Sequence, residues 1–379
     1  MYVPTFQGLS PIDWLKPAAV GTPCFPFASR GLSFYRARNA IYHLFRGLRA
    51  ITPRLEVLVP DYNSGNEVLA LRAAGAGIHF YRVGPDMRAD IDDVRRLCKA
   101  HDPEVLYVIH YLGWSQPLDA LKEICRERSM LLVEDCALSL LSQPDGAPLG
   151  SQSDWSIFCL YKTLPVPNGA LLVENTVPLA ALDRLRLRQA GGFSVLGRIT
   201  ELMVQRLRAR IDGVGTAIQT AKRAVGKAAG AMAVNRSTVG DIGFNLNDVD
   251  LAMSRTTERL LQRFNFDAIR QKRIANYRAL SAALNGSAKI AHDVLPEGAC
   301  PLVLPVLVKD KPSTAQSLRQ RGVDVLEFWN YGATDAAEES DHVRFLRSHV
   351  LGLPIHQDVS ARQLSFIAKQ FANLNPQAA

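Results

Sequence analysis

The sequence predicts an α/β protein in which a large domain with a mainly parallel sheet is followed by a smaller C-terminal α+β domain. Between residues 36 and 175, short apolar strands alternate with helices, which is typical of right-handed βαβ units with helices on both faces of a sheet. A chain of 379 residues suits two domains, and 47% hydrophobic residues are enough for a full core. We expect the large domain with its N-terminal arm at 1–178, a basic helical insert at 179–240 and the small domain at 241–379.

The elements follow from the spacing of apolar residues. The segment 38–48 carries them at i, i+3, i+4 and i+7 from Ile41, which predicts an amphipathic helix. Apolar runs predict strands at 55–60, 78–83, 105–110, 130–134, 155–160 and 170–173, separated by helices at 66–74, 91–99 and 118–128. In the small domain we expect one or two long helices over 249–284, strands at 300–308 and 323–329, and helices at 315–321 and 361–371.

Polar residues gather where the predicted strands end. Tyr62, His110 and Asp135 each end or closely follow an apolar strand, and Lys162 lies just beyond another. Ligands of such sheets bind beyond the carboxyl ends of the strands. We therefore expect these residues to meet at one edge of the sheet and to form a binding site.

Lys162 and Asp135 are the candidates for chemistry. A lysine withdrawn from water loses part of its preference for the charged form and becomes a nucleophile, although a surface lysine in a loop is the alternative. Asp135 ends a strand that should be buried, where its carboxylate needs a cation; the alternative is an aspartate that caps the next helix. A lysine that binds an aldehyde and an aspartate that keeps a ring nitrogen protonated are what pyridoxal 5'-phosphate (PLP) chemistry requires.

Other residues are candidates for contacts with this cofactor. Arg38 and Asn39 open the first helix, whose N-terminal amides and dipole suit a phosphate. Cys159 stands where a hydroxyl would reach the same phosphate, or it is a small buried apolar residue. His110 either contacts the phenolic oxygen or ring face of the cofactor or is a core histidine with satisfied hydrogen bonds.

Several short motifs occur in order along the chain. They are Val108-Ile-His110-Tyr-Leu-Gly113, Glu134-Asp135-Cys-Ala137, Gly150-Ser-Gln-Ser-Asp154, Lys162-Thr-Leu-Pro-Val-Pro-Asn-Gly169, Gly243-Phe-Asn245 and Leu353-Pro-Ile-His-Gln-Asp358. With them the chain resembles the DegT/StrS-type PLP-dependent aminotransferases of fold type I, many of which aminate keto-sugars attached to nucleotides. The resemblance covers nearly the whole chain except the basic insert. Within the family, the segment that follows Lys162 is similar to a branch in which an aspartate stands at the position of Asn168.

The resemblance implies that the mainly parallel sheet of the large domain has seven strands, and it implies roles for individual residues. It implies that Lys162 forms the Schiff base with PLP, that Asp135 pairs with the pyridine nitrogen and that the turn at 37–39 cradles the phosphate. Asn245 matches an asparagine that reaches the phosphate of the neighbouring subunit, which implies a homodimer with shared active sites. Two residues depart from the family pattern: Leu138 stands where glutamine or histidine is frequent, and Cys159 replaces a phosphate-binding serine.

The net charge of +8 is concentrated in the insert. Between residues 184 and 236 there are eleven basic and two acidic residues, a surplus of nine. This segment suits a solvated helical face, contact with an anionic membrane surface, or binding of a nucleotide-linked substrate. Nucleic acid is not an expected partner, because the aromatic residues of a single-strand binder are missing.

Composition sets the remaining expectations. The six cysteines (24, 98, 125, 136, 159 and 300) have neither disulfide-like nor metal-ligand spacing, so we expect a cytoplasmic protein, peripheral to the inner membrane face if the insert binds lipid, and no metal site. The resemblance to the aminotransferase family implies transfer of an amino group from glutamate or glutamine to a keto-sugar linked to a nucleotide. A non-catalytic relative that uses the insert for binding, and a PLP lyase or dehydratase, are the alternatives.

Overall fold

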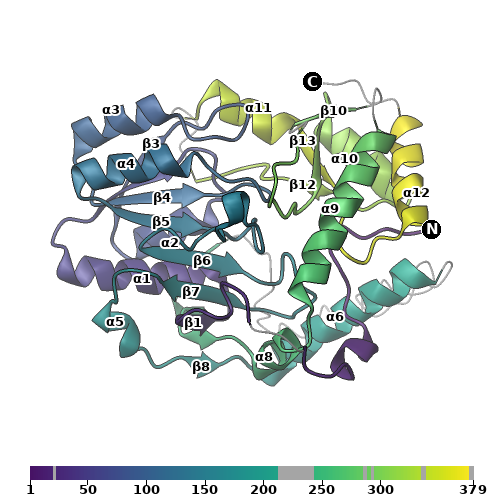
Figure 1. The fold of residues 1–379 in the computed structure, drawn as a ribbon, viewed down its shortest axis with the longest axis horizontal. Coiled ribbons are helices and arrows are strands. Elements are labelled where there is room, and N and C mark those ends of the chain that lie inside the picture. The colour runs from purple at the N-terminus through teal and green to yellow at the C-terminus, as the bar shows by residue number, and fades with distance from the viewer. Residues whose placement is uncertain (20–22, 212–242, 285–287, 292–293, 334–338, 375–379) are drawn as a thin grey trace, which may run out of the picture.

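The structure is a computed structural model, and it describes residues 1–19, 23–211, 243–284, 288–291, 294–333 and 339–374. Its large sheet has nine strands in the order β3-β2-β4-β5-β6-β7-β1-β9-β8 (Figure 1). Neighbouring strands from β3 to β6 are parallel, and β4 and β6 are buried over their whole length, as expected of strands covered on both faces. The main strands are β1 (Gly31–Phe34), β2 (Glu56–Pro60), β3 (Gly77–Tyr81), β4 (Val105–Ile109), β5 (Leu131–Asp135), β6 (Trp155–Cys159) and β7 (Ala170–Glu174).

This sheet confirms the predicted α/β class. Strands β1 to β7 form the expected seven-stranded unit, and two short strands, β9 (Leu251–Ala252) and β8 (Arg188–Gln189), extend its edge. Strand β7 is antiparallel to both β6 and β1, so the sheet is mainly but not wholly parallel. Strand β1 was not among the expected strands, because Gly31-Leu-Ser-Phe34 is not a continuous apolar run.

Helices cover both faces of the large sheet. Helices α3 and α4 lie together on one face, and α1 packs with α2 and α5 on the other (Figure 1). Their bounds are α1 (Ala37–Ile51), α2 (Asn66–Ala73), α3 (Ile91–His101), α4 (Leu118–Arg128) and α5 (Ala180–Asp183). Short 3-10 helices occur at η1 (Pro11–Trp14), η2 (Pro144–Gly146) and η3 (Leu246–Asp248). The layers leave the carboxyl ends of β4, β5 and β6 facing the C-terminal part of the chain (Figure 1).

The C-terminal part is built on a second, antiparallel sheet of four strands in the order β10-β11-β13-β12. The strands are β10 (Lys289–Ile290), β11 (Leu304–Leu307), β12 (Leu326–Glu327) and β13 (Val350–Leu353), and the helices are α8 (Arg255–Leu261), α9 (Phe266–Ala283), α10 (Lys311–Gln320), α11 (Asp341–His349) and α12 (Ala361–Ala372). Buried apolar residues of both sheets belong to one hydrophobic core, which fixes the small domain against the large one.

The segment 249–284 agrees with the expectation of one or two helices: it holds α8 and α9, and the Asn265 side-chain oxygen caps α9 by accepting from the amide of Ala268 at 2.9 Å. Other C-terminal elements differ from the prediction. The strand expected at 323–329 is reduced to β12, and Trp329 adopts a positive φ of 39° that ends the extended backbone. Helix α11 and strand β13 were not predicted as elements.

The described part of the basic insert, residues 179–211, contains α5, β8 and the long helix α6 (Gly192–Arg210), which packs on the rest of the chain. Arg206 forms an ion pair with Asp358, and the Arg208 guanidinium lies 4.5 Å from the ring centroid of Tyr2. These arginines are therefore not a free basic face. The charges at 222, 223 and 227 lie outside the described residues. Among the helices that are described, none combines the length and the apolar character that crossing a bilayer requires.

The N-terminal arm is held against the small domain by a buried histidine. The His356 ring bonds through Nε2 to the carbonyl of Pro4 at 3.1 Å, and its Nδ1 accepts from the amide of Asp358 at 3.3 Å. Both contacts suit the neutral ring. Burial, followed by the nearby charge of Arg273, lowers the pKa of His356 from 6.5 to about 3.

This lowered pKa predicts a loss of stability in acid. Because the folded-state pKa lies below the unfolded value, the stabilising contribution is complete above about pH 6.5 and is lost as pH falls towards 3. Between about pH 6.5 and 5 the loss is about 2 kcal/mol. Urea unfolding across this range should show a shallower pH dependence in His356→Gln than in the wild type. The exposed control His342→Gln should keep the wild-type dependence, and equal slopes in all three proteins would contradict the assignment.

Candidate active site

A cavity of about 490 Å³ lies where the large sheet meets the small domain. Its lining includes the start of α1, the ends of β4, β5 and β6, and the segment 326–331. Arg38, Asp135, Cys159 and Lys162, which the sequence predicted as site residues, all line it. The polar edge expected from the strand order is thus formed by residues of α1, β5, β6 and the loop after β6.

Asp135 presents a buried carboxylate to the cavity. Its Oδ2 accepts from the hydroxyl of Tyr107 at 2.6 Å, and its Oδ1 accepts from the amide of Ala137 at 2.8 Å. Within the described residues Asp135 forms no ion pair, although only 6% of the residue is exposed. A buried carboxylate in this setting is stabilised by a cation. The arrangement therefore suits a ligand that carries a positively charged N–H.

Tyr107 and Glu67 extend this polar wall and were not predicted. Burial, followed by the charges of Asp135 and Glu67, raises the pKa of Tyr107 well above its ordinary value, so its hydroxyl remains a donor. Burial and then Asp135 raise the pKa of Glu67, whose carboxylate accepts from the Ser64 amide at 2.6 Å. The Ser64-Gly-Asn-Glu67 sequence matches the Ser-x-x-Glu pattern of a helix start and was the available signal for Glu67, although the structure has Gly65 as the N-cap of α2 without a side-chain cap.

Lys162 lies on the cavity wall and is partly exposed, whereas the sequence suggested a buried lysine. The segment after it is firmly held. The Asn168 side chain bonds to the Ser254 hydroxyl at 3.2 Å and accepts from the Ser254 amide at 2.9 Å, and the Thr257 hydroxyl donates to the Asn168 carbonyl. Asn168 therefore connects the lysine loop to the start of α8.

Arg273 fixes the other side of the lysine loop. Its buried guanidinium donates to the Thr163 carbonyl at 3.2 Å and to the side-chain oxygens of Gln7 and Gln357 at 3.0 and 2.9 Å. Further bonds go to the carbonyls of residues 301 and 302. Burial lowers the pKa of Arg273 to about 10, which still leaves it charged at neutral pH. The N-terminal arm, the lysine loop and the small domain thus share one cation.

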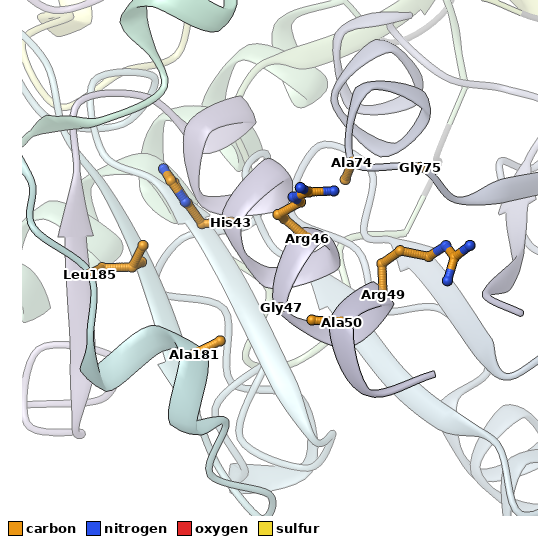
Figure 2. A pocket seen from close by; sticks show the side chains of 9 residues that line it. All are labelled: His43, Arg46, Gly47, Arg49, Ala50, Ala74, Gly75, Ala181 and Leu185. Carbon is orange, nitrogen blue, oxygen red and sulfur yellow. The ribbon is translucent and has the colours of Figure 1, made fainter. Parts of the chain in front are cut away.

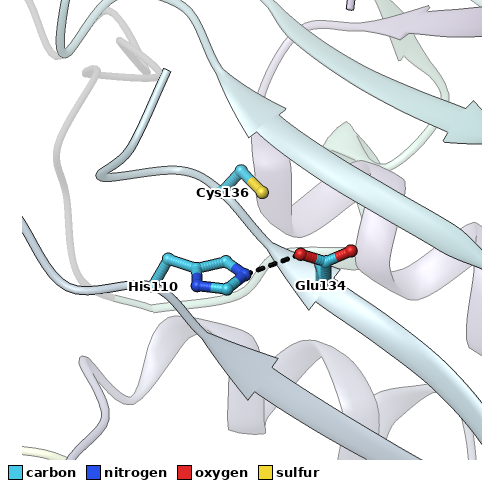
Figure 3. A group of neighbouring side chains, drawn as sticks. All are labelled: His110, Glu134 and Cys136. Atoms are coloured by element: carbon cyan, nitrogen blue, oxygen red, sulfur yellow. Dashed lines mark hydrogen bonds and ion pairs between the residues drawn. The ribbon is translucent and has the colours of Figure 1, made fainter. Parts of the chain in front are cut away.

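The sequence left two roles open for His110, a contact with the cofactor or a core histidine, and the structure turns its side chain away from the cavity. Ile109 lines the cavity, whereas the His110 ring bonds to Glu134 at 2.8 Å (Figure 3). The His110 ring also accepts from the Gln116 amide at 3.1 Å. Cys136 lies within 4.8 Å of this pair, and burial raises its pKa well above the usual range. With both ring nitrogens bonded and the thiol protonated, the group is a hydrogen-bonded core cluster.

Three other predicted residues lie outside the cavity lining. Asn39 donates to the carbonyl of Asp248 at 2.6 Å, behind the first turn of α1. Tyr62 is buried, with its ring centroid 5.2 Å from that of Trp329, which does line the cavity. Asn245 is exposed, and its side chain accepts from the amide of Asn247 at 3.0 Å. In a single chain these residues therefore do not meet Lys162.

A second cavity, of about 600 Å³, lies on the outer side of α1 (Figure 2). His43, Arg46 and Arg49 line it together with small residues of α2 and α5. No predicted site residue lines it, so we place the candidate active site in the cavity that contains Lys162 and Asp135.

The whole-chain comparison decides the family. A model of the DegT/DnrJ/EryC1/StrS aminotransferase family matches residues 39–370. The chain belongs to this family. Assignment to the DegT/DnrJ/EryC1/StrS aminotransferases agrees with the resemblance that the sequence motifs carry.

Named relatives of the family match part of the chain. GDP-perosamine synthase of Vibrio cholerae is 28% identical over 153 residues, which are 39% of this chain and 41% of the synthase. The dTDP-4-dehydro-2,3,6-trideoxy-D-glucose 4-aminotransferase of Saccharopolyspora spinosa is 29% identical over 149 residues, 37% and 38% of the two chains. The chain thus spans about two fifths of the length of these curated relatives.

Solved structures agree with the fold over nearly the whole length. Helicobacter pylori PseC, an aminotransferase involved in the biosynthesis of pseudoaminic acid, matches with a TM-score of 0.67 and 16% identity over 98% of both chains. The aminotransferase TlmJ of Streptoalloteichus hindustanus matches with a TM-score of 0.63 and 20% identity, over 91% of this chain and 86% of TlmJ. At these identities the likeness concerns the fold.

In this aminotransferase-family protein, replacing Arg273 should destabilise the fold. Arg273→Met leaves buried carbonyls and amide oxygens without a donor, at a cost of about 3 kcal/mol or more. Denaturant unfolding measures the loss. Arg278→Met, an exposed change on the same helix, should stay within about 0.5 kcal/mol of the wild type. If Arg273→Met lowered the free energy of unfolding no more than Arg278→Met does, Arg273 would not be the residue that joins the arm, the lysine loop and the small domain.

Proposed function

We propose that the protein is a PLP-dependent aminotransferase that transfers an amino group from glutamate or glutamine to the keto group of a nucleotide-linked sugar. The observation that carries the proposal is the position of Lys162 and Asp135 on one cavity. Family membership supports transamination, and the names of the relatives support a sugar acceptor.

The residues around the cavity fit PLP. Asp135 offers a buried carboxylate that needs a cation, which a protonated pyridine nitrogen supplies. Arg38 and the N-terminus of α1 offer positive charge to a phosphate. Burial raises the pKa of Cys159, so it remains a neutral thiol and adds little to phosphate binding. Lys162 offers the amine that binds the aldehyde covalently.

Each side chain around the cavity has a separate role in the proposed reaction. When bound, PLP supplies an electron sink for the electron pair left at the α carbon of the amino donor. Tyr107 and the Ala137 amide orient the Asp135 carboxylate, which holds a proton on the ring nitrogen. With PLP bound, Lys162 would hold its aldehyde, and its Nζ, once released by the amino donor, would be the group placed to move the α proton. Leu138 and Trp329 exclude water beside these groups.

We further propose a homodimer in which Asn245 of each copy serves the cavity of the other. Its exposed position outside its own cavity supports this arrangement, because the side chain is available to a second copy. The division into a large domain at 1–178, an insert at 179–240 and a small domain at 241–379 belongs to the same proposal.

Replacing the lysine tests the covalent step. The purified protein supplied with PLP should absorb visible light through the bond between Lys162 and the aldehyde, and Lys162→Ala should abolish that absorbance. Lys272→Ala, an exposed lysine change, should behave like the wild type. A wild type that stays colourless with added PLP would sink the proposal and favour a non-catalytic relative.

Replacing the aspartate tests the electrostatic step. Asp135→Asn keeps the side-chain shape but loses the charge that holds the ring proton, so the glutamate-driven spectral change should slow by about 100-fold or more. The visible absorbance itself should remain, since Lys162 is unchanged. Stopped-flow absorbance measures the rate, with the exposed change Asp119→Asn as control. An unaltered rate in Asp135→Asn would remove this residue from the mechanism.

A further inference from the structure

Helix α6 of the basic insert contributes a side chain to the active-site cavity. Arg198 lies near the middle of this helix and lines the cavity together with Phe6 of the N-terminal arm. Among the described residues of the lining, the basic ones are Arg38, Lys162 and Arg198. The proposed function uses the first two for the cofactor, and it leaves Arg198 without a role.

The position of Arg198 is fixed by contacts on either side of it along the helix. One turn earlier, the Ser194 hydroxyl is 3.1 Å from the hydroxyl of Tyr35, at the end of β1. One turn later, the carbonyl of Leu202 accepts from the amide of Leu9 at 3.1 Å. The following turn is also anchored, since Gln205 donates to the Phe6 carbonyl at 2.6 Å. Arg198 is therefore held at the cavity by the fold.

The Arg198 guanidinium keeps an N–H donor that no described residue accepts. Its Nη1 donates to Glu201 at 2.8 Å, but the Glu201 side chain is 52% exposed, and an exposed pair of this kind is weak. Its Nε is buried and has no acceptor among the described residues. A guanidinium has five N–H donors, and a buried donor without an acceptor is unfavourable. Arg198 is thus prepared to bind an acceptor that comes from outside the chain.

The carboxylates of the cavity do not take these donors, because each has other partners. Glu67 accepts from Ser64, and Asp135 accepts from Tyr107 and Ala137. The third, Glu327, accepts from Arg319 at 2.5 Å and from Asn330 at 3.2 Å. An anion that enters the cavity would therefore meet Arg198 without competition from these acids.

We propose that Arg198 is a substrate-binding residue that takes an anionic oxygen group. The planar fork of its donors matches carboxylate and phosphate groups, so the anion is either a phosphate of the acceptor or a carboxylate of the amino donor. The identity of these substrates rests on the proposed function. The insert then forms part of the active site through α6, in agreement with the nucleotide-linked substrate that its basic composition suggested.

Titration with two simple anions tests this role. Inorganic pyrophosphate represents the phosphate source and glutarate the carboxylate source, and isothermal calorimetry on the purified full-length chain measures each Kd. The variant is Arg198→Gln, and the matched control is Arg210→Gln, an exposed arginine in the last turn of α6. Loss of one charge-assisted contact should weaken binding by about 10- to 100-fold in Arg198→Gln and should leave Arg210→Gln at the wild-type Kd.

The outcomes separate the two sources. Weakened pyrophosphate binding assigns Arg198 to the acceptor, and weakened glutarate binding assigns it to the donor. The assignment is overturned if neither anion binds the wild type, if Arg198→Gln binds as the wild type does, or if Arg210→Gln loses as much. Should Arg198→Gln fail to fold, Arg198→Lys keeps the charge without the planar fork, and unchanged affinity there would overturn it equally. The titrations contain no PLP, so a colourless protein would defeat the proposed function and leave this result standing.

Discussion

The hydrogen bonds that Tyr107 and the Ala137 amide donate to Asp135 hold a carboxylate at the edge where β4, β5 and β6 end. Folding withdraws this group from water and gives it donors but no cation within the described residues. A buried carboxylate is stabilised when a ligand supplies the cation that pairs with it. The rest of the site follows from this requirement, because Lys162, Arg38 and the start of α1 surround the same cavity.

A second constraint keeps the lysine loop in place. Arg273 donates to the Thr163 carbonyl and at the same time to Gln7 and Gln357, so the arm and the small domain are joined beside Lys162. The burial of a guanidinium without a carboxylate is unfavourable unless its donors are satisfied, and here they are. Movement of the small domain would therefore disturb the lysine loop, which couples the two parts of the chain at the site of chemistry.

The sequence predicted the sheet and four cavity residues because both follow from local pattern. Apolar runs mark buried strands, and the carboxyl ends of parallel strands meet at one edge, which brings Asp135, Cys159 and Lys162 together. The interpretation of His110 as a contact of the cofactor does not fit, because successive side chains of a strand point to opposite sides. Ile109 faces the cavity, and its neighbour His110 therefore faces the other side. Arg198 comes from a distant segment, and only tertiary packing brings it to the cavity.

In the proposed function, the aldehyde of PLP binds Lys162 and no other lysine. Lys311 is the natural competitor, since it is buried and burial lowers its pKa to about 8. Reduction of the PLP-treated protein with borohydride makes a carbon–nitrogen bond permanent, and mass spectrometry of the digested protein then locates the added pyridoxyl group. The pyridoxyl group should be found on the peptide that contains Lys162. A pyridoxyl group on Lys311, or on no lysine, would contradict it.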